Sequence, residues 1–277
     1  MRRARGLVVA VLLAVAVSAV AGPAVQVAAH RGGALLWPEN SLLAFRNALA
    51  LGADLLELDV HLTSDGEVVV IHDPTLERTS TGTGAVGAAR LADLAGTRLR
   101  ARDGAATDEP VPTLAQVLDL LRPGRAELLL EIKVDPARRP YAGIEEKTLA
   151  LVNARGLRER TVVMAFESDT LRRVRALDPS IRTTMLVSRS RVDRERATAS
   201  TVVGWAREVG ATSLGIDQRA LDAPLVAAAR QAGLRVAAWT VNTEADIRRI
   251  LDLGVDVVIS DQPDLVLRLA GRPPKTP

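Results

Sequence analysis

The chain has 277 residues, 36 of them basic and 33 acidic, with 48% hydrophobic residues, 2% aromatic residues and no cysteine. This length allows one large α/β domain or two small ones, with a sizeable buried core. The composition excludes a fold held by disulfides, and so few aromatic side chains argue against a base-stacking surface for nucleic acid.

The first residues have the pattern of an export signal. Arg2, Arg3 and Arg5 precede an apolar run over residues 7–17, and small residues follow it. We therefore predict a signal peptide over residues 1–21 and an exported protein, whether secreted, periplasmic or attached to the cell wall. The apolar run is short for a membrane span, so an uncleaved anchor is the alternative and the one membrane contact to expect. Without these arginines basic and acidic residues balance, so no polyanionic partner is predicted.

Apolar runs and turn residues predict a regular alternation of strands and helices. We expect strands over residues 25–29, 55–59, 67–71, 127–132, 162–166, 182–187, 212–216, 235–239 and 255–260. We expect helices over residues 42–51, 113–121, 143–154, 169–177, 197–209, 223–232 and 244–253. The connection over 74–112 is predicted to be an irregular insertion with a weak helix near 91–95. The arginine-rich run 188–196 is predicted to be a solvated loop.

The third strand follows a tight turn and is therefore antiparallel to the second. If Asp65 and Gly66 form a two-residue loop, Asp59 lies directly opposite His72, and Glu57 shares their face. The other eight strands alternate with helices, which predicts a (β/α)8 barrel over residues 22–271 with an antiparallel hairpin after strand two. A doubly wound sheet is the competitor, but no Gly-rich phosphate-binding turn follows the first strand. Residues 272–277 are predicted to be a disordered tail.

Polar residues gather at the carboxyl ends of the predicted strands, which form the active face of such a barrel. Glu57, Asp59 and Glu131 offer only oxygen ligands, so they predict a site for one divalent cation, Mg²⁺ or Ca²⁺. Ion pairs with the many arginines are the alternative for each acid taken alone. His30 and His72 are candidates for a general acid and a general base.

Other residues at this face have more than one interpretation. Arg31 and Lys133 suit the binding of a phosphoryl group, although Arg31 could be structural. Trp239 could form an apolar wall for an alcohol, and plain core packing is as good an interpretation. His61 shares the face of Glu57 but lies nearer the turn, so we expect it at the rim or in solvent.

Eight short motifs together resemble the glycerophosphodiester phosphodiesterase family in order and spacing. They are His30-Arg31-Gly32, Pro38-Glu39-Asn40-Ser41, Glu57-Leu58-Asp59-Val60, Thr63-Ser64-Asp65-Gly66, Val70-Ile71-His72-Asp73, Pro112-Thr113-Leu114, Glu131-Ile132-Lys133 and Trp239-Thr240-Val241-Asn242. The resemblance covers nearly all of the chain after the leader. Ser41 is a departure, since family members mostly have threonine there.

The resemblance implies a barrel with residues 74–112 inserted over its mouth. It implies a divalent cation on the three acids, His30 and His72 as acid and base, and phosphate contacts from Arg31 and Lys133. Glu39 and Asn40 would support or orient the site. The implied reaction is hydrolysis of a small glycerophosphodiester to sn-glycerol 3-phosphate and an alcohol.

Two alternatives remain on the sequence alone. One is an exported phospholipase or teichoic-acid phosphodiesterase of the same barrel superfamily, although the insertion is mostly small, polar or charged. The other is an inactive barrel that binds phosphodiesters without cleaving them.

Overall fold

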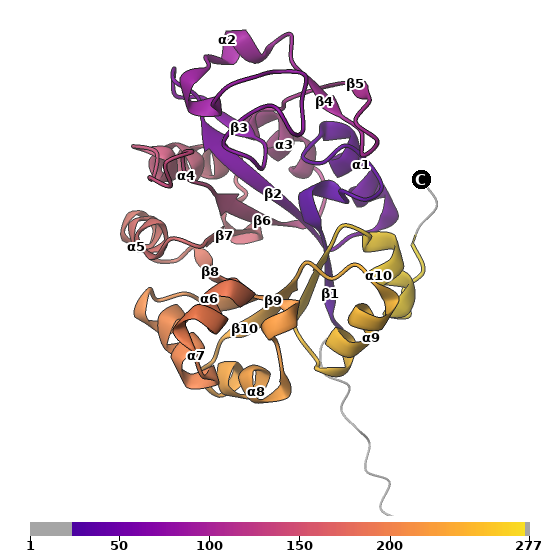
Figure 1. Ribbon diagram of the computed structural model, residues 1–277, viewed down its shortest axis with the longest axis vertical. Coiled ribbons are helices and arrows are strands. Elements are labelled where there is room, and N and C mark those ends of the chain that lie inside the picture. The colour runs from indigo at the N-terminus through magenta and orange to yellow at the C-terminus, as the bar shows by residue number, and fades with distance from the viewer. Residues whose placement is uncertain (1–23, 275–277) are drawn as a thin grey trace, which may run out of the picture.

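The computed structural model describes residues 24–274, and eight parallel strands form a closed barrel within them (Figure 1). The barrel closes because the first strand pairs with both the last and the second. The strands are β1 (Gln26–Ala29), β2 (Leu55–Leu62), β6 (Glu127–Ile132), β7 (Thr161–Ala165), β8 (Arg182–Val187), β9 (Ser213–Asp217), β10 (Arg235–Trp239) and β11 (Val257–Ser260). The predicted barrel is therefore confirmed, and the signal-peptide prediction lies outside the described residues.

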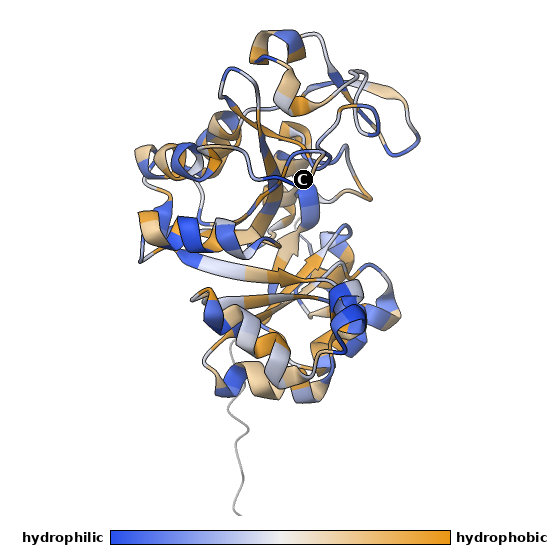
Figure 2. Cartoon of the chain, turned by 60° about the vertical axis from the view of Figure 1, so that its left-hand side comes forward, coloured by the Kyte–Doolittle hydropathy of each residue, from blue (hydrophilic) through white to orange (hydrophobic). Residues whose placement is uncertain are grey.

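Helices cover the outside of the barrel (Figure 1). They are α1 (Leu42–Leu51), α3 (Leu114–Leu121), α4 (Ile144–Ala154), α5 (Ser168–Leu177), α7 (Ala199–Glu208), α8 (Ala223–Gln231), α9 (Glu244–Asp252) and α10 (Pro263–Leu269). Buried apolar side chains from strands and helices pack together in two clusters, and orange hydrophobic segments recur along both kinds of element (Figure 2). A third cluster, made of strand residues, fills the barrel interior and includes Leu55, Met164 and Leu186. Each fully buried aliphatic side chain contributes about 1.5–3 kcal/mol to stability.

The loop predicted over 188–196 is instead a helix, α6 (Arg189–Glu195). The Ser188 side chain accepts a hydrogen bond from the backbone N–H of Arg191 and so caps it. Two ion pairs four residues apart, Arg189 with Asp193 and Arg191 with Glu195, line its surface. The charged residues of this run are thus spaced for the surface of a helix, which a count of charges alone does not reveal.

The antiparallel strand β3 (Val68–Val70) is present, but its predicted register is wrong by one residue. Val60 pairs with Val70, and Thr63 N–H donates to the Glu67 carbonyl at 2.9 Å. The loop therefore holds three residues, closed by Gly66 at φ 82°, which is the arrangement of a turn followed by a left-handed bulge residue. Asp59 consequently faces Ile71, and His72 lies just beyond the paired region, where strand alternation no longer sets its direction.

Residues 74–112 are more regular than predicted. They contain α2 (Leu91–Leu94) and a hairpin of β4 (Arg98–Arg100) and β5 (Ala106–Pro110), besides a short 3₁₀ turn. A small apolar cluster of Val69, Ile71, Leu76, Val86, Leu94, Leu99 and Val111 joins this insert to β3. The insert therefore packs against the hairpin of β2 and β3, beside the carboxyl ends of the strands (Figure 1).

Two further observations concern the ends of the described chain and the membrane. Arg272, the first residue of the predicted tail, donates to both carboxylate oxygens of Asp54 at 2.7 and 2.9 Å. Residues 275–277 lie outside the description. Within residues 24–274, we find no helix with the length and apolar character that a membrane crossing requires.

Gly66→Ala should lower the free energy of unfolding by about 1 kcal/mol, because a Cβ disfavours the left-handed conformation that closes the hairpin. Gly96→Ala is the control, since Gly96 lacks a positive φ and its added Cβ would meet nothing within 4 Å. Urea denaturation of both variants measures the difference. Equal stabilities would contradict this account of the turn.

Candidate active site

A cavity of about 110 Å³ opens at the carboxyl ends of the strands. One wall is polar and comes from the first strands and the hairpin: His30, Arg31, Glu57, His72, Glu131 and Lys133. The opposite wall is mostly apolar and comes from later strands: Met164, Phe166, Leu186, Trp239, Thr240 and Ile259. The barrel thus brings the residues predicted from separate strand ends to one place.

Glu57, Asp59 and Glu131 each place one carboxylate oxygen within 4.8 Å of the others. Asp59 and Glu131 are direct partners in the β2–β6 pairing, and Glu57 lies two residues earlier on the same face. All three side chains are buried, with exposed fractions of 2%, 1% and 8% in chain order. This crowding of negative charge away from water is costly unless protons or cations neutralise it.

The acids respond to this crowding in different ways. Burial and the charge of Asp59 raise the pKa of Glu57 to about 8. Burial also raises the pKa of Glu131 above its ordinary value, despite its pairing with Lys133. Burial opposes ionisation of Asp59, but the charges of Lys133, His72 and Arg31 and a hydrogen bond from Asn40 hold the pKa of Asp59 far below its ordinary range.

The donor set fits a divalent cation. Asp59 Oδ2 accepts from Asn40 Nδ2 at 3.0 Å, whereas the buried Oδ1 has no hydrogen-bond partner among the described residues. Lys133 Nζ lies 3.5 Å from that oxygen and 2.7 Å from Glu131 Oε1. Three carboxylates, one with an unpartnered oxygen, are the ligands that Mg²⁺ and Ca²⁺ prefer.

His30 follows β1 directly, in a 3₁₀ turn where Arg31 has a φ of 51°. Its Nδ1 lies 2.6 Å from Asp261 Oδ1, and Asn242 Nδ2 donates to the other oxygen of Asp261 at 2.6 Å. Burial opposes protonation of His30, but Glu57 and the hydrogen bond to Asp261 raise its pKa. Asp261 was missed from sequence, although it directly follows the last strand, as His30 follows β1 and Lys133 follows β6.

His72 has the same kind of support from a different part of the chain. Its Nδ1 lies 2.6 Å from Asp73 Oδ1. Burial and the charges of Lys133 and Arg31 lower its pKa, outweighing Asp59 and Asp73. In both histidines Nδ1 is committed to a carboxylate, which leaves Nε2 as the nitrogen that can exchange a proton with a ligand.

The expectation for His61 is wrong. This residue is completely buried rather than at the rim. Its Nε2 lies 3.0 Å from the His72 carbonyl, which can only accept, so Nε2 carries the proton. Nδ1 then accepts from the Tyr141 hydroxyl at 2.8 Å. His61 thus ties the end of the hairpin, and with it His72, to the barrel.

The remaining predicted residues surround the polar wall. Arg31 Nη1 donates to Glu39 Oε1 at 3.1 Å, and its Nε lies 3.5 Å from Asp59 Oδ2. Trp239 packs edge-to-face on Phe166, with ring centroids 5.5 Å apart, and both line the cavity. The two cations beside the acids and the aromatic pair across from them give the cavity one charged and one apolar side.

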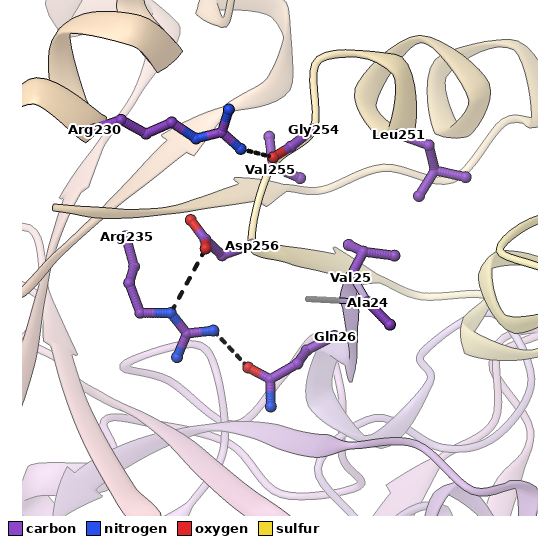
Figure 3. A pocket seen from close by; sticks show the side chains of 9 residues that line it. All are labelled: Ala24, Val25, Gln26, Arg230, Arg235, Leu251, Gly254, Val255 and Asp256. Atoms are coloured by element: carbon purple, nitrogen blue, oxygen red, sulfur yellow. Dashed lines mark hydrogen bonds and ion pairs between the residues drawn. The ribbon is translucent and has the colours of Figure 1, made fainter. Parts of the chain in front are cut away.

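A wider hollow of about 640 Å³ lies at the other end of the barrel (Figure 3). The described residues that line it include Gln26, Arg230, Arg235 and Asp256, but no histidine and no group of acids. Arg235 pairs with Gln26 at 2.6 Å and lies 3.9 Å from Asp256. In this hollow Arg235 and Asp256 thus face each other at the amino ends of the strands. Residues at that end of a barrel contribute to stability rather than to chemistry.

Comparison with known proteins agrees with this geometry. Residues 30–265 match the model of the glycerophosphoryl diester phosphodiesterase family. A glycerophosphodiester phosphodiesterase of Caldanaerobacter subterraneus is 32% identical over 246 residues, which cover 88% of this chain and 96% of the relative. The crystal structure of a glycerophosphodiester phosphodiesterase from Agrobacterium tumefaciens has 30% identity and a TM-score of 0.73, covering 88% of this chain and 99% of that one.

A phosphodiesterase of Oleispira antarctica, solved with its product sn-glycerol 3-phosphate, has 28% identity and a TM-score of 0.74 and covers 90% of this chain and 97% of that one. Fold and site thus define a barrel of the phosphoric diester hydrolase class. The chain belongs to the glycerophosphoryl diester phosphodiesterase family.

His61 should make stability sensitive to acid. Burial lowers its pKa to about 4, whereas the unfolded chain has an ordinary value near 6.5. As the pH falls from 6.5 to 4, His61 takes up a proton in the unfolded state but not in the folded state. The free energy of unfolding therefore decreases on acidification. Relative to His61→Gln, the wild type should lose roughly 2 kcal/mol of unfolding free energy between pH 7 and pH 4.5. A difference that does not change with pH would contradict the burial of a neutral imidazole.

Proposed function

We propose that this protein hydrolyses glycerophosphodiesters to sn-glycerol 3-phosphate and an alcohol, and that the reaction requires one divalent cation, Mg²⁺ or Ca²⁺. The observation that carries the proposal is the carboxylate cluster beside two carboxylate-anchored histidines in one cavity. The family match and the product-bound structure of the Oleispira relative support the substrate class.

Each residue has a part in the proposed reaction. Glu57, Asp59 and Glu131 would hold the cation, which supplies Lewis-acid polarisation of the phosphoryl oxygens when bound. Arg31 and Lys133 offer positive charge to the phosphoryl group. The two histidines act through Nε2. One takes a proton from the attacking water, or from a substrate hydroxyl whose cyclic phosphate product water then opens, and the other protonates the alkoxide that leaves as the phosphorus–oxygen bond breaks.

The apolar wall and the mouth favour a small diester over a long-chain lipid. Phe166 and Trp239 offer an apolar surface to the organic part of the substrate. Among the described residues, only Leu36 and Leu177 are large hydrophobic residues with exposed side chains, so the broad apolar rim expected of a lipase is lacking there. We also propose that the protein is exported, because the leader has the signal pattern described above.

Chelation should abolish release of sn-glycerol 3-phosphate from glycerophosphocholine, and Mg²⁺ or Ca²⁺ should restore it. Glu131→Gln should have the same effect at any concentration of either cation, because it removes a ligand. Glu127→Gln is the matched control, since Glu127 lies at the opposite end of β6 and pairs with Arg182. Full activity of the Glu131 variant, or of the chelated enzyme, would refute cation dependence.

His30→Ala and His72→Ala should each lower kcat by roughly 100- to 10,000-fold, the usual contribution of a general acid or base. Circular dichroism should report an unchanged fold in both variants. A coupled assay for glycerol phosphate measures the rates, with a long-chain lysophospholipid tested beside glycerophosphocholine. Turnover near the wild-type rate in both variants would contradict the two-histidine mechanism, and faster cleavage of the lysolipid would favour the phospholipase alternative.

A further inference from the structure

One arginine of the insert joins two parts of the active site. Arg78 donates from Nε and Nη2 to the two carboxylate oxygens of Asp73 at 2.6 and 2.9 Å. It also donates from Nη1 and Nη2 to the two oxygens of Glu39 at 3.0 and 2.9 Å. A single guanidinium thus makes two bidentate contacts, which requires the planar fork of arginine and cannot be reproduced by lysine.

Both carboxylates also hold a residue that lines the cavity. Asp73 Oδ1 is the partner of His72 Nδ1 at 2.6 Å, and Glu39 Oε1 accepts from Arg31 Nη1 at 3.1 Å. The result is a continuous chain from His72 through Asp73, Arg78 and Glu39 to Arg31. It crosses from the end of the hairpin to the turn after β1.

The two histidines differ in how firmly the barrel places their partners. The partner of His30, Asp261, directly follows β11 and is held by Asn242, so the barrel itself orients it. Asp73 lies three residues after β3 ends, outside the paired region. Its orientation therefore depends on contacts from elsewhere, and Arg78 provides two of them.

A purely stabilising role explains this arrangement poorly. The Arg78 side chain is 48% exposed, and Asp73 and Glu39 are 24% and 16% exposed. Because half of the Arg78 side chain is open to water, even a bidentate network of this kind adds only modestly to global stability. Direct substrate contact is also not indicated, because no residue of the insert lines the cavity. What the bonds do fix is the direction of two side chains, and small errors in such directions are costly to turnover.

We propose that Arg78 is a positioning residue for this active site, acting through Asp73 on His72 and through Glu39 on Arg31. The inference rests on the proposed function, and it gives the insert a role in turnover without a contact to substrate. Arg78 thereby fixes the end of the hairpin relative to the turn after β1.

The test compares R78A, R78K and R90A as full-length proteins with glycerophosphocholine and Mg²⁺. Arg90 is the matched control, an insert arginine that is 71% exposed and lies 3.7 Å from Asp65. R78A should lower kcat on the order of 10- to 100-fold with an unchanged unfolding midpoint. R78K should recover only part of this loss, because it restores the charge but not the fork. R90A should match the wild type.

A double-mutant cycle separates positioning from a general effect. D73N should lower kcat, and adding R78A to D73N should lower kcat by less than about twofold further, because the same support is already lost. E39Q should raise KM more than it lowers kcat, since it acts through the phosphate-facing Arg31. Full additivity of D73N and R78A, or an R78A enzyme that behaves like R90A, would overturn the proposal.

Amide hydrogen exchange tests the same idea without relying on activity. In R78A, residues 72–80 and 38–40 should exchange faster than in the wild type and in R90A, while the barrel strands stay protected. If the wild type cleaves no glycerophosphodiester but this local loosening occurs, the proposed function fails and the structural part of the inference stands. Unchanged exchange in both segments would overturn the positioning role.

Discussion

The repulsion among Glu57, Asp59 and Glu131 is the constraint on which the rest of the site depends. Parallel pairing of β2 with β6 sets Asp59 beside Glu131, and the closed barrel removes all three acids from water. Burial of three carboxylates within 4.8 Å of one another does not stabilise the fold, because the free-energy cost of desolvating them exceeds the attraction of the nearby side-chain cations. The cluster is therefore best explained by a ligand, and the pairing of Arg31 and Lys133 with it keeps the site assembled.

The two histidines reach this cluster by different routes. His30 and its partner Asp261 directly follow two neighbouring strands of the barrel, β1 and β11, so the paired ends of these strands fix their positions. His72 and Asp73 follow the antiparallel strand β3, and they are held by the buried His61 of β2 and by Arg78 of the insert. The insert and the buried His61 thus orient His72, whereas the barrel itself orients His30.

Much of this could be predicted from the sequence, because strand ends and face parity are local patterns. The barrel, the three acids and the two histidines follow from the alternation of strands with helices and from polar residues at strand ends. The hairpin register could not be predicted, since a three-residue loop with Gly66 in the left-handed region competes with the two-residue loop. Asp261 lies 231 positions from His30, so no local pattern links them. The buried His61 takes its hydrogen bond from Tyr141, which comes from another loop, so its partner could not be predicted from local sequence.

The most direct test of the cation site is calorimetric titration of the metal-free protein with Mg²⁺ and with Ca²⁺. The wild type should bind one cation per chain, and Glu127→Gln should bind as the wild type does. Asp59→Asn should bind neither cation, because it removes the charge of one of the three proposed ligands. Absence of binding to the wild type, or unchanged binding to Asp59→Asn, would contradict the assignment of these carboxylates to a metal.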